Sequence, residues 1–179
     1  MRKRIVAGVL ACGAVAPAAA LGSSGAPKLP KFPSKLIVPG RSAGGVSLGE
    51  GAAKAIRAWR GNSSCTPSSS LVECTWGSDA NGADGSISLS FANGKVTLIT
   101  LQLDGNTRGI PIYKGPMMAL KTKQGIGLKS TVAQLEKHYP GQVGTNSLGD
   151  TLGTGTHTTT FRTSGGEFVA ILIGTPPNY

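Results

Sequence analysis

The chain has 179 residues, of which 18 are Lys or Arg and 8 are Asp or Glu, so its formal net charge is +10. Aromatic residues make up only 5% of the sequence, and past the first four residues no basic run is interleaved with aromatic ones, which disfavours a nucleic-acid-binding protein. The cations either favour an acidic partner, such as an acidic protein or an anionic envelope polymer, or serve solubility alone.

Residues 1–20 have the layout of a secretory signal peptide. Three basic residues at positions 2–4 precede a short apolar stretch, and Ala-Ala-Ala at positions 18–20 offers a cleavage site. The stretch is too short and too rich in small residues to predict a transmembrane span in the mature chain. We therefore expect a secreted or cell-envelope protein. A lipid anchor at Cys12 is the alternative, because the residues before it loosely resemble a lipoprotein signal.

Residues 21–40 are predicted to form an extended leader. They hold four prolines and several lysines, and proline disfavours both helices and central strands. The leader either presents its lysines to an acidic surface or is an ordinary disordered terminus.

Residues 45–61 align without a gap to residues 125–141, which indicates an internal repeat. In each copy the apolar residues recur at helical spacing and an aromatic residue, Trp59 or Tyr139, stands near the end. The second copy also has a Thr-x-x-Gln capping box at residues 131–134. These features predict one short amphipathic helix in each copy, with Trp59 and Tyr139 anchored in the core.

Cys65 and Cys74 are the only cysteines left once the signal peptide is removed. An exported chain meets an oxidising environment, so we expect these two thiols to form a disulfide. Two cysteines without a nearby histidine cannot complete a structural zinc site. Neither a metal nor a cofactor is predicted.

Sequence with β-pattern follows each predicted helix. Asn93-Gly94 and Gly165-Gly166 are turn signals, each flanked by strand-like segments. A further, weaker strand is expected near residues 142–153. The predicted strands span residues 71–76, 86–91, 96–101, 158–161 and 168–173.

These elements predict an α+β fold of two tandem units, each a helix followed by an antiparallel β-meander. We expect the units to share one sheet with both helices on one face. The first unit is placed at residues 41–104, a connector at residues 105–124 and the second unit at residues 125–179.

The motif Gly-Val/Ile-x-Leu at residues 45–48 and 125–128 leads in each case into a helix that ends Trp/Tyr-x-Gly. Its layout is similar to that of SmpA/OmlA-type outer-membrane assembly lipoproteins and of the tandem-repeat beta-lactamase inhibitory proteins, over roughly residues 45–174. The resemblance implies a non-catalytic module that binds another protein or an envelope component through an exposed sheet face or loops. Two departures are the missing lipobox and the missing cysteine pair in the second unit.

Four residues are candidate binding residues. Lys121, Lys123 and Lys129 surround the turn into the second predicted helix, where backbone N–H groups favour an anion. Trp76, beside Cys74, is a candidate contact for a ligand.

The two histidines, His138 and His157, have no acid or nucleophile at a spacing typical of a catalytic family. No catalytic residue is therefore predicted, and the protein is not expected to be an enzyme. We expect an exported, non-catalytic binding or interaction module. The alternatives are a cell-surface hydrolase that uses one of these histidines, and a structural envelope component held by charge through its leader.

Overall fold

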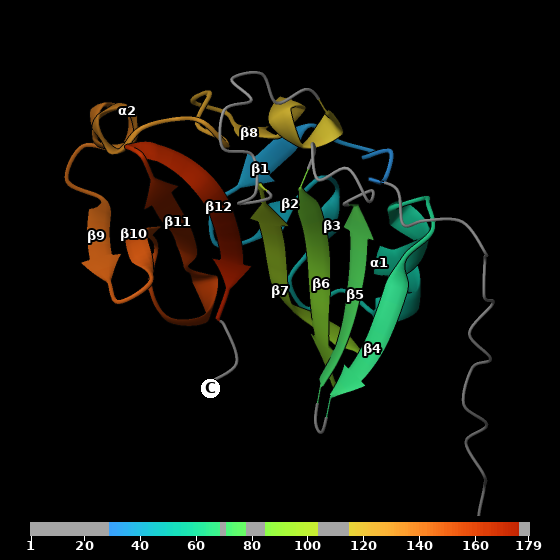
Figure 1. Cartoon of the computed structure of the whole chain (residues 1–179). Coiled ribbons are helices and arrows are strands. Elements are labelled where there is room, and N and C mark those ends of the chain that lie inside the picture. Colours follow the sequence, from blue (N-terminus) through green and yellow to red (C-terminus); the bar gives the residue numbers. More distant parts are fainter. Residues whose placement is uncertain (1–28, 69–70, 78–84, 104–114, 176–179) are drawn as a thin grey trace, which may run out of the picture.

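The computed structural model describes residues 29–68, 71–77, 85–103 and 115–175. In Figure 1 these residues form two sheets, one large and one small, with two short helices. The predicted signal peptide, residues 1–20, and Cys12 lie outside the described residues.

The large sheet has eight strands, and every neighbouring pair in it is antiparallel. Strands β7 and β12 meet at its centre through five pairs of residues, from Ala170↔Gln102 to Gly174↔Leu98. In sheet order the strands are β4 (Ser64–Ser68), β5 (Leu71–Gly77), β6 (Ser86–Ala92), β7 (Lys95–Gln102), β12 (Glu167–Gly174), β11 (Thr159–Ser164), β10 (Gly149–Leu152) and β9 (Val143–Asn146).

The two edges of the large sheet differ. Edge strand β4 carries Pro67, which pairs with Val72 of β5, whereas edge strand β9 is four residues long. The β6–β7 hairpin turns at Asn93-Gly94, and Asn93 has a φ of 50°. A turn with positive φ at both central residues suits Asn-Gly, so the predicted hairpin is confirmed.

The small sheet contains segments that the sequence did not predict as strands. Its order is β3 (Val46–Ser47), β2 (Ser42–Ala43), β1 (Leu36–Val38) and β8 (Lys121–Thr122). β1 lies within the predicted leader, yet it is a central strand of this sheet and pairs in parallel with β8. Part of the predicted leader therefore belongs to the folded body.

Both predicted helices are present. The first, α1 (Ala52–Ala58), and the second, α2 (Val132–His138), have seven residues each. The predicted capping box of α2 is confirmed, because Thr131 Oγ1 accepts from the Gln134 amide while Gln134 Oε1 accepts from the Thr131 amide. Two 3-10 turns, η1 (Pro116–Ala119) and η2 (Gly155–His157), complete the described elements.

The predicted α+β fold of two tandem helix-plus-meander units is wrong, because the described chain is mostly β and forms sheets of eight and four strands. Two helices of two turns each cannot form a layer over eight strands. The small sheet instead supplies much of the covering structure. It takes β1 from the predicted leader, β2 and β3 from the start of the first predicted unit, and β8 from the predicted connector.

One face of the large sheet is packed into the hydrophobic core. Alternate residues of β6 and β7, such as Ile87, Leu89 and Ile99, are fully buried and belong to one cluster with α1, α2 and the small sheet. Trp59 and Tyr139, the C-cap residues of α1 and α2, are buried in that cluster, as predicted. No helix among the described residues combines the length and the apolar character needed to cross a membrane.

Candidate functional site

The predicted disulfide between Cys65 and Cys74 is confirmed, with an S–S distance of 2.05 Å. The two residues are directly paired across β4 and β5. Cys74 is buried in the core while Cys65 is exposed. The bond therefore fixes the edge strand β4 to the packed body of the sheet.

Trp76, the predicted contact for a ligand, lies in the hydrophobic core of the described chain. Its side chain is fully buried, and its ring lies 5.3 Å from that of Trp59 in an edge-to-face arrangement. Trp76 lies on β5 next to Thr75, whose side chain lines the opposite face. The alternation of side chains along a strand thus places Trp76 in the core.

The three predicted lysines do not form one cluster of cations. Lys121 and Lys129 line a hollow of about 260 Å³ beside α2, whereas Lys123 is exposed outside it. Lys129 Nζ lies 2.7 Å from Glu167 Oε2. The charge of Lys129 is therefore already compensated by a carboxylate, which weakens the predicted anion site.

The two histidines lie on different elements. His138 ends α2 and lines the hollow beside Lys121, whereas His157 ends η2, where Nδ1 lies 3.2 Å from Thr156 Oγ1. Both side chains are exposed. In the part of the chain that the structure describes, no three residues of the types that bind metals come together.

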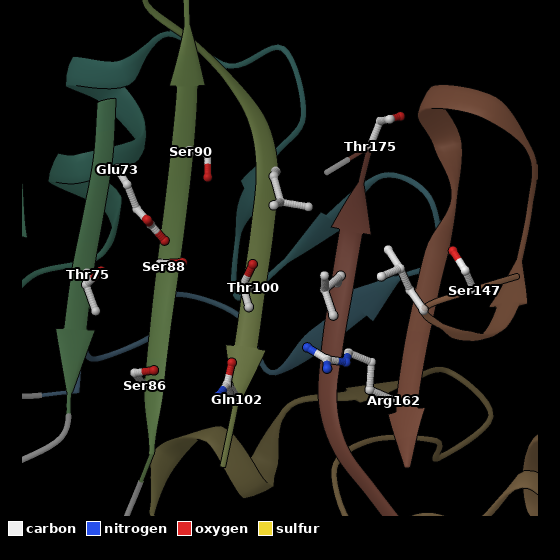
Figure 2. Close-up of a pocket in the computed structure, with 13 residues that line it drawn as sticks. Glu73, Thr75, Ser86, Ser88, Ser90, Thr100, Gln102, Ser147, Arg162 and Thr175 are labelled. Atoms are coloured by element: carbon white, nitrogen blue, oxygen red, sulfur yellow. The ribbon is translucent and has the colours of Figure 1, made fainter. Parts of the chain in front are cut away.

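A cavity lies on the face of the large sheet opposite the core (Figure 2). It is a groove of about 800 Å³, and ten of its 13 lining residues have polar or charged side chains. Most of the lining comes from the central strands, and the rest from the β9–β10 turn and the end of β12. The lining residues are Glu73, Thr75, Ser86, Ser88, Ser90, Leu98, Thr100, Gln102, Ser147, Leu148, Arg162, Leu172 and Thr175.

The strict alternation of β6 creates the floor of this groove. Ile87 and Leu89 enter the core, so Ser86, Ser88 and Ser90 point to the other face. Serine side chains are too short to fill the space above a curved sheet. The floor therefore stays low, and the groove remains open.

A row of small hydroxyl side chains runs across seven strands of the sheet. The register pairs that define it lead from β4 to β10, and six of its seven members are Ser or Thr. In order the row is Ser64, Thr75, Ser88, Thr100, Leu172, Thr160 and Thr151.

Two residues of opposite charge stand at the two ends of the groove. Glu73 comes from β5 and Arg162 from β11, and Figure 2 shows both side chains reaching inward over the strands between them. They are the charged residues among the described lining residues. Within the described chain, neither these two side chains nor Gln102 makes a hydrogen bond or ion pair with another residue.

The sequence did not single out these groove residues. The run Ser86-Ile87-Ser88-Leu89-Ser90 predicted a strand with one polar face, but not what that face would do. Three successive outward serines were the available signal, because serine is a poor filler for a packed surface and a good hydrogen-bonding group.

Comparison with protein-family models, with curated proteins and with solved structures gave no significant match. The function must therefore be inferred from the chemistry of the groove itself.

Proposed function

We propose that this chain is an exported, non-catalytic binding module that holds a partner protein in the polar groove of its large sheet. The observation that carries the proposal is the set of polar side chains in the groove that have no partner within the described chain, Glu73, Gln102 and Arg162 among them.

The groove offers many donors and acceptors in a small space. A partner that covers them must supply hydrogen bonds of its own, because polar groups that lose water without gaining a partner cost free energy. Hydroxyl groups such as those of Ser88 and Thr100 can both donate and accept. The surface therefore suits the mixed donors and acceptors of another polypeptide.

Export is supported by two features. The N-terminal sequence has a basic start and a cleavage site at residues 18–20. The Cys65–Cys74 disulfide is typical of a protein that works in an oxidising compartment.

A binding role is favoured over catalysis by the placement of the reactive groups. Glu73 and Arg162 stand at opposite ends of the groove, and the two histidines lie outside it. No nucleophile and base are paired within its described lining, and such a pair is the usual mark of an acyl-transfer site.

Site-specific photo-crosslinking tests the proposal. A photoreactive phenylalanine analogue would replace Gln102 in the groove or, as the control, Lys95, which is exposed at the other end of the same strand β7. Each full chain would be expressed in the cells that make the protein and then irradiated.

We expect a discrete protein adduct from position 102 and none from position 95. An adduct only at position 95, or none at either position, would contradict the proposal.

A further inference from the structure

We infer that the occupant of the groove is a loop of the partner protein that carries an acidic residue for Arg162 and a basic residue for Glu73, in a fixed order. This inference rests on the proposed function, and it adds the polarity and the size of the bound segment.

The two charged residues are too far apart for a small zwitterion to reach both. Arg162 lies four strand spacings from Glu73, across β6, β7 and β12, which corresponds to about 19 Å. The two residues are also offset along the strand direction. Glu73 pairs with Ser90 of β6, whereas Arg162 is in register with Ser86, four residues away on the same strand. That offset of four residues adds about 14 Å along the strands. The Cα atoms are thus about 23 Å apart, or about seven extended residues.

The chain between the two charges would lie over the hydroxyl row. Ser88 and Thr100 are directly paired on β6 and β7, with Gln102 one row away. A loop backbone presents alternating N–H and C=O groups, which hydroxyl and amide side chains can match in either direction. The small floor residues leave room for that backbone to approach closely.

The charge of the groove contrasts with that of the chain. The whole sequence carries a net charge of +10, yet the described groove lining holds one acid and one base. A purely anionic polymer would meet Glu73 unfavourably at one end. The partner segment must therefore be bipolar and not simply acidic.

Other ligand classes fit this surface less well. Among the described lining residues none is aromatic, so the groove has no face on which a nucleobase could stack. The same lack removes the apolar platform that sugar rings commonly pack against. Small-molecule pockets are mostly apolar and enclose their ligand, whereas this groove is open and is lined mostly by residues with polar side chains.

A library of random disulfide-closed loops, displayed on phage and selected on the full chain, provides the probe. The strongest binding loop would be synthesised in two forms, as selected and with its acidic and basic residues exchanged. Both forms would be titrated against the wild-type protein and against Glu73→Lys/Arg162→Glu, which reverses the groove and keeps the net charge.

We expect selected loops to carry one acidic and one basic residue in a common order. The reversed groove should bind the original loop about a hundredfold more weakly and recover most of that loss with the exchanged loop. The matched control is Lys95→Glu/Glu136→Lys, which reverses an exposed base and an exposed acid outside the groove. It should bind the original loop as the wild type does.

Blocking the groove separates failure of this inference from failure of the proposed function. Thr100→Tyr would fill the floor, and Thr75→Tyr would replace it if the first variant did not fold. Suppose that tyrosine blocks the selected loops, but that their charges have no common order or that their affinity does not respond to the charge reversal. Either result would overturn the inference of a bipolar loop. The proposed groove-binding function would still hold.

Selection of no loop at all, or of loops that tyrosine does not block, would overturn the inference. Combined with a negative crosslink at position 102, it would also remove the proposed function. Binding of an oligosaccharide array that tyrosine blocks, without any selected loop, would assign the groove to a glycan instead.

Discussion

Trp59 and Trp76 meet edge to face in the core, with ring centroids 5.3 Å apart and ring planes at 80°. The contact joins the end of α1 to β5, yet within the described chain only one of the two indole N–H groups has a hydrogen-bond acceptor. Trp59 Nε1 donates to the Gly44 carbonyl oxygen at 3.1 Å. Trp76 Nε1 is buried and has no hydrogen-bond acceptor within the described chain.

This difference predicts unequal costs for the same substitution. Trp59→Phe should lower the free energy of unfolding by about 1–2 kcal/mol more than Trp76→Phe, because only the first leaves a carbonyl without its donor. Urea denaturation followed by far-ultraviolet circular dichroism measures both values. Equal losses in the two variants would show that the Gly44 hydrogen bond adds nothing to stability.

The Cys65–Cys74 bond should stabilise the fold modestly. It closes a loop of eight intervening residues, so the chain-entropy contribution is about 2–3 kcal/mol. Reduction should therefore lower the guanidinium midpoint of the wild type. The double variant Cys65→Ala/Cys74→Ala should start near the lower midpoint and should not respond to reductant. A response of that variant would point to an effect of the reductant elsewhere.

The N-caps of the two helices predict changes of opposite sign. Thr131→Ala removes the side chain that caps α2 and should cost about 1 kcal/mol of unfolding free energy. Gly51, the N-cap of α1, has an extended conformation, and a Cβ there would meet nothing within 4 Å. Gly51→Ser should therefore raise the unfolding free energy by a few tenths of a kcal/mol. Thermal denaturation of the two variants against wild type measures both signs, and a loss on Gly51→Ser would argue against the open N-cap.

Gly174 at the central seam should tolerate no side chain. Its φ is 108°, and an added Cβ would clash with the Thr97 carbonyl oxygen. Gly49 also has a positive φ, 77°, but open space around it. Gly49→Ala should cost about 1 kcal/mol through backbone conformation alone, and Gly174→Ala should cost clearly more because a strand must move as well. Chemical denaturation ranks the two, and similar costs would contradict the close approach of β7 and β12.

Processing of the N-terminus can be measured directly. Intact-mass analysis of protein collected outside the cytoplasm should show a chain that begins near residue 21, without the three basic residues at positions 2–4. A mass that includes Met1 would contradict export through a cleaved signal. A lipid-sized mass increase on Cys12 would favour the anchored alternative.

Local signals in the sequence were sufficient for several elements. The Asn93-Gly94 turn and the alternation around it located β6 and β7, and the capping box located α2. Each depends on residues only a few positions apart, so a single stretch of chain contains the whole signal. The alignment of residues 45–61 with residues 125–141 stays a prediction.

The small sheet could not be found in this way. Its strands are two or three residues long, and β1 pairs Leu36 with Lys121, which is far away in the sequence. Segments this short have no readable period, and prolines around β1 argued for an extended leader. The predicted fold class is wrong for this reason, because the pairing of β1 with β8 joins segments that are far apart in the sequence.

The groove was hidden for a related reason. Glu73 and Arg162 are separated by most of the sheet, and they face one groove only because β12 lies beside β7. Strand order is a property of the whole chain and not of either residue's neighbourhood. The alternating serines of β6 indicate one polar face, but they do not predict which charged residues lie at the two ends of the groove.

Pro67 on the edge strand β4 affects how the molecule meets its neighbours. Proline has no amide hydrogen, so a strand of another molecule that paired with β4 would lack one backbone hydrogen bond there. The opposite edge, β9, offers only four residues. Long, unbroken edges are templates for fibrous growth, and a sheet whose described edges are short or broken by proline can be present at high concentration without recruiting copies of itself into a continuous sheet.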